Sequence, residues 1–317
     1  MINIENELAG AREVGITGHI RPDGDCIGAC MAMYLYLQKA MPQLKVHVFL
    51  EDIPTIFYVI KDTDKIEKAE EFLGSIDTFI VLDCAKDRTG ACEKLIQNAG
   101  KVINIDHHLS NASGSGDINY IVPEASSASE LVYDVIDKEK LDTEIAKAIY
   151  IGMINDTGVF QYSNTSKKTM EIAGKLITYD FDFPALIQKT FYEKTYVQNQ
   201  ILGRALLESI LFMDGHCIVS SVDRKTMEFY DAKPKHLDGI VSQLKNTRGV
   251  DCAIFMYEIG TMEYKVSLRS NEKVNVAEVA ENFGGGGHAR AAGCTVRGTF
   301  HDVVNNLSLY IQKQLKL

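Results

Sequence analysis

Clusters of acidic and histidine residues follow four separate apolar segments of this 317-residue chain. Three of the segments resemble strands, at 14–17, 79–82 and 102–105, and the fourth, at 145–154, resembles a helix. The clusters are His19-x-x-x-Asp23-x-Asp25, Asp83, Asp106-His107-His108 and Asn155-Asp156. Charged residues are poor core material, and an open parallel sheet binds ligands outside the carboxyl ends of its strands, at the switch in strand order. We therefore expect the four clusters to converge on one site.

The first half of the chain alternates strand-like runs with helical runs. The expected strands are 14–18, 45–50, 78–84 and 101–106, and the expected helices among them are 27–40 and 92–99. This alternation predicts βαβ units, and therefore an α/β fold with a doubly wound parallel sheet. Further helices are expected at 127–138, 143–154 and 167–179, the second of them capped by Thr143.

The pattern changes after Gly215. Strands are expected at 216–221, 253–257 and 264–268, and helices at 234–244 and 276–282, which predicts a smaller α/β domain. A chain of this length with 46% hydrophobic residues can bury two cores. We therefore predict an N-terminal domain at 1–189, a helical linker at 190–214 and a C-terminal domain at 215–317, with the active site in the cleft between the domains.

The charge balance restricts the class of ligand. Forty-three acidic against 33 basic residues give a formal net charge of −10, so a long polyanion finds little electrostatic attraction, and no long nucleic acid is expected as a partner. A small phosphorylated ligand remains compatible with this charge, because bound cations reverse the sign of the local field.

The chain also carries signals about its compartment. No apolar run approaches the length of a membrane span, and residues 1–13 are polar and acidic rather than signal-like, which predicts a cytoplasmic protein with no membrane partner. The seven cysteines are odd in number and scattered, with no C-x-x-C pair, which favours reduced thiols over a disulfide framework or a zinc ribbon.

The clusters supply enough ligands for two divalent cations. Two metals about 3.5–4 Å apart, bridged by a carboxylate, can clamp the attacking water and the leaving oxygen of a phosphoryl displacement. A reasonable division gives one ion His19, Asp23 and Asp83, and the other Asp25, Asp83, His107 and Asp156, with Asp83 as the bridge. Carboxylate and imidazole ligands without thiolate favour Mn²⁺, with Mg²⁺, Co²⁺ or Fe²⁺ as rivals.

Asp83, Asp106 and His108 are the expected catalytic residues. Asp106 would orient a histidine through its ring N–H, and His108 would donate a hydrogen bond to the scissile phosphate. Simpler readings stay open for single clusters. Residues 106–108 could form a surface loop, and Asp23 or Asp25 could cap a helix that begins at Cys26. Asp83 could merely end a strand, and Cys26 and Cys84 could be soft ligands or, more simply, buried neighbours.

The motifs resemble those of a known family. Residues 18–28 (GHIRPDGDCIG), 81–83 (VLD), 106–108 (DHH) and 155–158 (NDTG) resemble the four motifs of the DHH phosphoesterases. Residues 285–293 (GGGHARAAG) resemble the GGGH signature of the first type of DHH-associated domain. The resemblance follows the family order and covers nearly the whole chain.

The resemblance also separates the subfamilies. Family II pyrophosphatases lack the glycine–histidine signature, and RecJ-like exonucleases are longer and carry an additional nucleic-acid-binding fold. The chain is most similar to the nano-RNase/pAp phosphatases. That similarity implies an exoribonuclease for short RNA oligonucleotides that is also a 3′(2′),5′-bisphosphate nucleotidase, removing the 3′-phosphate of 3′-phosphoadenosine 5′-phosphate (pAp) with water activated by two metals. A stand-alone cyclic di-AMP or pApA phosphodiesterase and a non-catalytic nucleotide-binding module remain alternatives, and a homodimer is compatible with the sequence.

The glycine-rich signature suggests where a substrate phosphate binds. Gly285, Gly286 and Gly287 could turn their N–H groups toward an anion, with His288 as a directed donor. Arg269 ends a predicted strand and suits bidentate phosphate contact. We expect these five residues to bind the substrate, while the role of Arg290 stays open. Residues 162–165 could contact substrate, although helix capping by Asn164 or Thr165 is the simpler interpretation.

Overall fold

The computed structural model describes residues 2–316, which divide into two compact units. The first unit ends at Glu193 and the second begins at Lys194. No helix in the described chain is both long and apolar enough to cross a membrane.

The first unit is built on a six-stranded sheet in which every neighbouring pair of strands is parallel. Its order is β3-β2-β1-β4-β5-β6, so the direction of winding reverses between β1 and β4. The predicted doubly wound parallel sheet is confirmed. The strands are β1 (Glu13–Thr17), β2 (Lys45–Phe49), β3 (Ile66–Glu67), β4 (Thr78–Leu82), β5 (Lys101–Asp106) and β6 (Ile118–Ile121).

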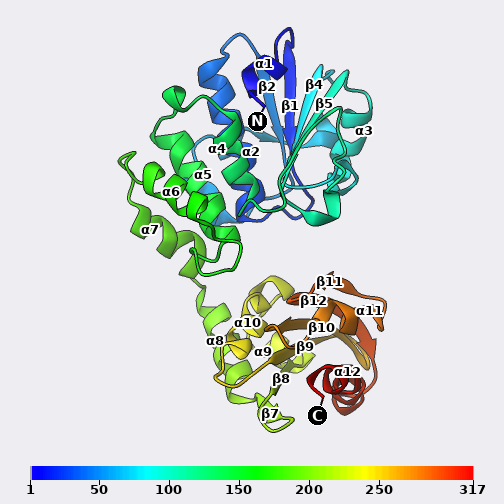
Figure 1. Cartoon of the computed structure of the whole chain (residues 1–317). Coiled ribbons are helices and arrows are strands. Elements are labelled where there is room, and N and C mark those ends of the chain that lie inside the picture. Colours follow the sequence, from blue (N-terminus) through cyan, green and yellow to red (C-terminus); the bar gives the residue numbers. More distant parts are fainter. Residues whose placement is uncertain (1, 317) are drawn as a thin grey trace. The chain divides into compact units, whose positions relative to one another are not determined.

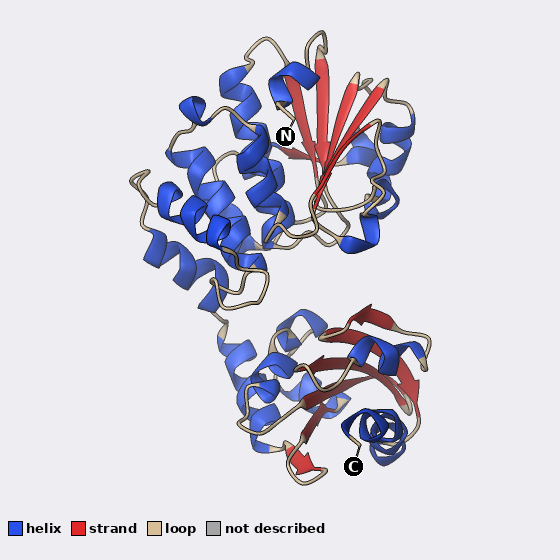
Figure 2. Cartoon of the chain, in the orientation of Figure 1, coloured by secondary structure: helices blue, strands red, loops and turns tan. Residues whose placement is uncertain are grey.

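Helices cover both faces of this sheet. Figure 1 shows α2, α4 and α5 on one face and α3 on the other, and Figure 2 shows the same layers by type of structure. All five residues of β4 are buried because both faces are covered. The helices of this unit are α1 (Ile4–Glu7), α2 (Gly24–Ala40), α3 (Glu93–Gln97), α4 (Ala128–Val135), α5 (Thr143–Asp156), α6 (Lys167–Leu176) and α7 (Phe183–Ile187).

Helices α2 and α5 touch through their backbones. A Cβ added at Gly28 would lie 2.8 Å from the carbonyl oxygen of Ala148 and 2.8 Å from the amide nitrogen of Gly152. A Cβ at Gly24 would lie 2.6 Å from the Cβ of Asn155. The earlier residue of α2, Gly24, meets the later part of α5, and the later residue, Gly28, meets an earlier part. The two helices are therefore antiparallel. The start of α2 therefore lies beside the end of α5.

The second unit is a smaller α/β unit with a mixed sheet. Its strand order is β11-β12-β10-β9-β8-β7, in which only β8 and β9 pair in parallel. The strands are β7 (Ile210–Phe212), β8 (Cys217–Val222), β9 (Cys252–Gly260), β10 (Glu263–Ser270), β11 (Gly286–His288) and β12 (Ala291–Arg297). The helices are α8 (Tyr196–Leu207), α9 (Arg224–Phe229), α10 (Ile240–Lys245), α11 (Val276–Glu281) and α12 (Phe300–Leu315).

Several elements differ from the sequence-based expectation. The edge strands β3 and β6 were not predicted, because they are short and only partly buried and so carry little apolar signal. The expected helix at 234–244 is broken, since Gly239 adopts a left-handed φ of 87° between a 3₁₀ turn and α10. Helix α12 was missed, although Val303, Leu307 and Ile311 recur at helical spacing and are all buried.

The expected N-cap of α5 was wrong by one residue. The side chain of Asp142, rather than Thr143, accepts hydrogen bonds from the backbone N–H groups of Glu144 (3.1 Å) and Ile145 (3.0 Å). Asp142 also forms an ion pair with Lys39, but both side chains are 44% exposed, so that pair contributes little.

We expect Asp142→Ala to lower the free energy of unfolding by about 1 kcal/mol, because two N–H groups of α5 lose their acceptor. Urea unfolding followed by circular dichroism measures the change. Thr143→Ala is the matched control and should change the free energy by less than about 0.5 kcal/mol. A larger loss in the control than in Asp142→Ala would contradict this assignment of the cap.

Candidate metal centre

The ligand-type side chains converge at the switch point of the sheet. His19 follows β1, Asp83 follows β4, and His107 and His108 follow β5. Three groups have ligand atoms that all lie within 4.8 Å of one another: His19 with Cys26 and Asp83, Asp83 with His107 and His108, and Asp25 with His107 and Asp156. Because Asp83 and His107 each belong to two groups, the three groups form one continuous cluster.

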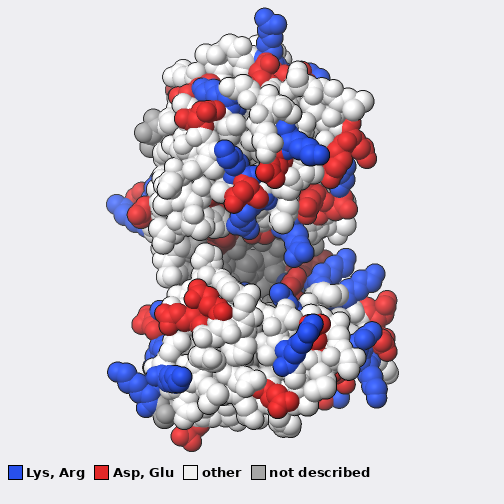
Figure 3. Space-filling model, turned by 90° about the vertical axis from the view of Figure 1, so that its right-hand side faces the viewer, with Lys and Arg blue, Asp and Glu red and all other residues white. Residues whose placement is uncertain are grey.

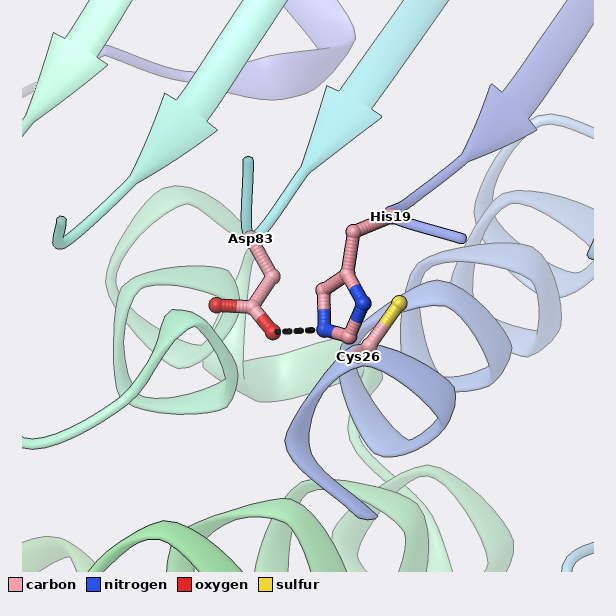
Figure 4. A group of neighbouring side chains, drawn as sticks. All are labelled: His19, Cys26 and Asp83. Atoms are coloured by element: carbon pink, nitrogen blue, oxygen red, sulfur yellow. Dashed lines mark ion pairs between the residues drawn. The ribbon is translucent and has the colours of Figure 1, made fainter. Parts of the chain in front are cut away.

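His19 is held with one ring nitrogen directed at Asp83. Its Nε2 lies 3.4 Å from Asp83 Oδ2, as Figure 4 shows, and 3.7 Å from Asp23 Oδ1. Its Nδ1 donates to the carbonyl oxygen of Ile20 at 2.9 Å. A backbone acceptor on one nitrogen fixes the tautomer and presents the other nitrogen to a metal.

Asp83 is the most constrained residue of the cluster. It adopts a left-handed φ of 62°, which is uncommon for a residue other than glycine but is tolerated by aspartate. Its side chain is 3% exposed, and its buried Oδ1 accepts no hydrogen bond among the described residues, although Nε2 of His107 lies 3.3 Å away. Leaving a buried carboxylate oxygen without a partner is costly. A cation next to Oδ1 would remove that cost, so the residues present fit a metal ion.

Helix α4 holds the carboxylate of Asp25. The backbone N–H of Ala128 donates to Oδ2 at 2.6 Å, and that of Ser129 donates to Oδ1 at 3.0 Å. The start of a helix favours negative charge, because its N–H groups are not used within the helix. Each carboxylate oxygen accepts one of these bonds and keeps a lone pair for a metal.

His107 connects the ligands from β4, α2 and α5. Its Nε2 lies 3.3 Å from Asp83 Oδ1, 3.5 Å from Asp156 Oδ2 and 3.9 Å from Asp25 Oδ2. Its Nδ1 lies 3.3 Å from the carbonyl oxygen of Ala125. The structure thus brings together all four residues expected around the second ion.

Asp23 lies at the edge of the cluster. Its side chain is 63% exposed and caps α2, with Oδ1 accepting from the N–H groups of Asp25 and Cys26 at 3.1 Å each. The capping interpretation is therefore correct for Asp23, and α2 begins at Gly24 rather than at Cys26. Capping uses Oδ1, so Oδ2 can still serve as a ligand.

Asp106 orients His108 and not His107. This fully buried carboxylate accepts from His108 Nδ1 at 2.8 Å, from the backbone N–H of His107 at 2.7 Å and from Asn111 at 2.8 Å. Burial alone would raise the pKa of Asp106, but the bond from His108 and the other donors lower it. In the described chain no hydrogen bond involves Nε2 of His108.

Two carboxylates of this cluster have raised pKa values, chiefly because they are buried and also because neighbouring carboxylates repel them. Burial, followed by the charges of Asp83 and Asp156, raises the pKa of Asp25 well above its usual range. Burial is also the main reason why the pKa of Asp156 is raised to about 6. Divalent cations would relieve both effects, because they invert the local electrostatics.

Cys26 lies within this cluster, in one group with His19 and Asp83. It is fully buried, and burial raises its pKa well above the usual range. Cys84 is also buried, and its pKa is raised chiefly by burial.

Two asparagines in this unit were not recognised as structural parts of the site. Asn104 Nδ2 donates to the carbonyl oxygens of Val81 (3.2 Å) and Cys84 (2.9 Å), and its Oδ1 accepts from Asn111 (2.8 Å). It thus fixes the loop that carries Asp83. The signal in the sequence was a polar residue inside the apolar run 102–105.

Asn164 connects two segments that carry ligands. Its Nδ2 donates to the carbonyl oxygens of Ser126 (2.9 Å), just before α4, and Asp156 (3.2 Å), the last residue of α5. The expected capping role of Asn164 or Thr165 is wrong, because Ser166 caps α6.

In the second unit, Arg269 and His288 lie on the same face of the sheet. Both are paired with Ala291 of the strand between them, since Arg269 of β10 and His288 of β11 each lie opposite it. Residues directly opposite one another in an antiparallel sheet project to the same face. The small Ala291 side chain therefore lies between an arginine and an exposed imidazole.

The glycine run allows close packing of the backbone against β12, and some of its N–H groups are used in backbone hydrogen bonds. The N–H groups of Gly284 and Gly285 donate to the carbonyl oxygens of Glu281 and Ala280, so the expectation that Gly285 presents its N–H to an anion is wrong. A Cβ at Gly285 would lie 2.6 Å from the Cβ of Cys294, and one at Gly287 would lie 2.6 Å from the Cα of Ala292. Glycine is needed here because β11 lies so close to β12.

Arg290 supports a turn rather than facing a ligand. Its guanidinium donates to the carbonyl oxygens of Asn271 and, at 3.4 Å, Val274.

A doubly wound sheet with carboxylates and imidazoles gathered at its switch point defines a metal-binding α/β protein. Two family matches agree with this class: the DHH family, N-terminal domain, over residues 13–153, and the DHHA1 domain, over residues 214–316. The chain belongs to the DHH family.

Two of its relatives match over most of their length. The bifunctional oligoribonuclease and PAP phosphatase NrnA of Mycoplasma pneumoniae is 30% identical, over 90% of this chain and 88% of that protein. The protein of the same name from Bacillus subtilis is 27% identical, over 88% of this chain and 87% of that protein. The crystal structure of an exopolyphosphatase-related protein from Bacteroides fragilis superimposes with a TM-score of 0.89 at 25% identity, over 98% and 94% of the two chains.

Binding of a divalent metal should release protons. Burial opposes charge on both imidazoles, but Asp23 and Asp83 raise the pKa of His19 to about 12, and Asp83, Asp25 and Asp156 raise the pKa of His107 to about 10. Without metal both rings are therefore protonated at neutral pH, and a ring must lose a proton to bind metal. We expect metal affinity to rise between pH 6.5 and 8.5, by about tenfold per pH unit for each proton displaced.

Isothermal titration calorimetry in two buffers of different ionisation enthalpy measures the number of protons released. His19→Asn should release fewer protons than the unmodified protein, whereas His47→Gln, which changes a histidine paired with Glu13 and Glu67 away from this cluster, should not. Affinity that does not change with pH would contradict the metal site.

Proposed function

We propose that this protein is a metal-dependent phosphoesterase that releases mononucleotides from very short RNAs and removes the 3′-phosphate of pAp. The observation that carries the proposal is the buried Oδ1 of Asp83, which has no hydrogen-bond partner in the described chain and lies 3.3 Å from His107 Nε2. Relatives that share 27–30% of the sequence over almost the full length carry the name of this activity.

We assign two divalent cations to the cluster, with Mn²⁺ as the proposed metal and Mg²⁺, Co²⁺ and Fe²⁺ as competitors. The first ion takes His19, Asp23 and Asp83, and the second takes Asp25, Asp83, His107 and Asp156. When bound, such a pair activates water and neutralises charge on the phosphoryl oxygens. The buried, mutually repelling carboxylates support this assignment.

The residues of the chain then have separate tasks. In its doubly protonated form, His108 would donate from Nε2 to an oxygen of the scissile phosphate, while Asp106 holds the ring for this contact by accepting from Nδ1. A donor fixed before the reaction needs no reorganisation when charge develops on that oxygen. Helix α4 keeps the Asp25 carboxylate in place through the N–H groups of Ala128 and Ser129.

The second unit is proposed to bind a further part of the substrate. Arg269 and His288 flank Ala291 on one face of the sheet. Gly286 and Gly287, the two residues before His288 in β11, have no side chains. We assign residues 1–189 to a catalytic domain and residues 215–317 to a substrate-binding domain, joined by a linker at 190–214.

The proposed compartment is the cytoplasm. All seven cysteines are free and buried, which fits a reducing environment.

Two substitutions should separate metal binding from substrate binding. Asparagine tolerates the left-handed backbone of position 83, so Asp83→Asn should stay folded while losing at least one metal per chain and nearly all turnover. Arg269→Ala should keep its full metal content and act chiefly through a higher KM. Elemental analysis and steady-state kinetics measure both. Full metal content in Asp83→Asn would remove Asp83 from the metal site, and unchanged kinetics in Arg269→Ala would remove Arg269 from substrate binding.

Substrate length provides the test of the function itself. We expect turnover per end to be highest on RNAs of roughly two to five nucleotides, because a net charge of −10 offers a longer strand little attraction. On the face shown in Figure 3, basic and acidic side chains both occur on each unit, without a continuous basic stripe. The measurement is turnover of 5′-labelled RNAs from dimer to about twenty nucleotides at fixed salt and Mn²⁺, with pAp, pApA and cyclic di-AMP alongside.

Equal or faster degradation of the longest strand would contradict the proposal and favour a RecJ-like exonuclease. Preferred turnover of cyclic di-AMP would favour a cyclic-dinucleotide phosphodiesterase, and no turnover of any member would favour a nucleotide-binding module.

A further inference from the structure

Two exposed arginines lie on neighbouring loops next to the metal ligands. Arg21 lies in the loop after β1, two residues beyond His19, and Arg88 lies in the loop after β4, five residues beyond Asp83. Strands β1 and β4 are the pair at which the sheet reverses its winding. Both loops therefore leave the sheet at its ligand-binding edge.

Ile20 joins these loops to the candidate metal centre. Its carbonyl oxygen accepts the bond from His19 Nδ1 at 2.9 Å, and its N–H donates to the carbonyl oxygen of Arg88 at 3.0 Å. A Cβ at Gly90, which has a left-handed φ of 58°, would lie 2.5 Å from Ile20 Cγ2. The two loops are thus packed against each other, and Ile20, which contacts both, orients the ring of His19, a proposed metal ligand.

The backbone at Arg21 is fixed by a carboxylate. Arg21 has a left-handed φ of 54°, and its N–H donates to Glu51 Oε2 at 2.8 Å. Such a conformation costs of order 1–3 kcal/mol and persists only where the surroundings impose it. Here the Glu51 bond supplies part of that constraint.

The basic side chains of these loops are not neutralised by ion pairs. Within residues 2–316, no ion pair joins Arg21, Lys86 or Arg88 to a carboxylate, and all three are exposed. The acidic residues nearest to these side chains, along the chain or by contact, are Asp23, Asp87 and Glu51, and none of them forms an ion pair with Arg21, Lys86 or Arg88 in the described chain. Arginine suits such a place for phosphate, because its planar fork can bond two phosphate oxygens together.

We propose that Arg21 and Arg88, assisted by Lys86, bind a second phosphate of the substrate, next to the phosphate that is hydrolysed. In pAp this would be the 5′-phosphate, and in a short RNA the adjacent backbone phosphate. The inference rests on the proposed function. The metals would neutralise the charge of the scissile phosphate. The second phosphate would be repelled by the carboxylates of the cluster unless basic side chains at the same edge of the sheet neutralise its charge.

Two substrates that differ by one phosphate isolate this contact. We expect Arg88→Ala to raise KM for pAp by roughly ten- to a hundredfold, as the loss of a charged hydrogen-bond pair implies, and to change KM for adenosine 3′-phosphate by less than about twofold. Arg21→Asn should act in the same direction, since asparagine tolerates the left-handed backbone. Arg88→Lys should fall between Arg88→Ala and the unmodified protein, because it keeps the charge but loses the fork.

Arg12→Ala is the matched control, since Arg12 is an exposed arginine just before β1, at the opposite end of the strand from Arg21. It should leave both KM values unchanged, and all variants should keep their metal content by elemental analysis. Equal effects of Arg88→Ala on the two substrates, no effect on either, or an equal effect of Arg12→Ala would overturn the proposal.

Failure of this inference can be told apart from failure of the proposed function. If the unmodified protein turned over neither substrate, the function would be wrong, and calorimetric binding of pAp to the metal-loaded variants would then test the second phosphate contact directly. If the unmodified protein hydrolysed pAp and Arg21→Asn and Arg88→Ala did so with the same KM, only the inference about these arginines would fall.

Discussion

The backbone contact between α2 and α5 is the constraint on which the site depends. Gly28 lies against Ala148 and Gly152 so closely that no side chain fits between the helices. Because the helices are antiparallel, this contact brings Asp25, in the first turn of α2, to Asp156, the last residue of α5. A larger residue at Gly28 would separate the helices and, with them, two carboxylates that are proposed to bind one cation.

Placing Asp25 close to other buried carboxylates has an electrostatic cost. Asp25 is buried beside Asp83 and Asp156, and its pKa is raised well above the usual range by burial and by their charges. Part of the cost is offset locally, since the first N–H groups of α4 bond both oxygens of Asp25. Asp83 Oδ1 receives no such bond within the described residues. The fold thus stabilises the carboxylate of Asp25 by backbone hydrogen bonds, whereas Asp83 Oδ1 is proposed to be stabilised by a cation.

The sequence predicted what lies at the ends of apolar runs and missed what depends on contacts between distant segments. His19, Asp83 and His107 each follow a buried strand, so a parallel sheet places them together. One contact of the site that escaped prediction is long-range. Asp25 and Ala128 are 103 residues apart in the chain, and no local pattern indicates their bond. The edge strand β3 has only two residues, too few for an apolar rhythm.

The two groups of proposed functional residues differ in how much folding each requires. The candidate metal centre would take its ligands from the ends of β1, β4 and β5 and from two helices, so it would exist only when the whole first unit is folded, and cations that bind it would stabilise that unit. Arg269 and His288, in contrast, are aligned by three neighbouring strands and need only the pairing of each with Ala291. The proposed substrate-binding face can therefore form without metal, whereas the candidate metal centre would couple ligand binding to the stability of the sheet and helices that build it.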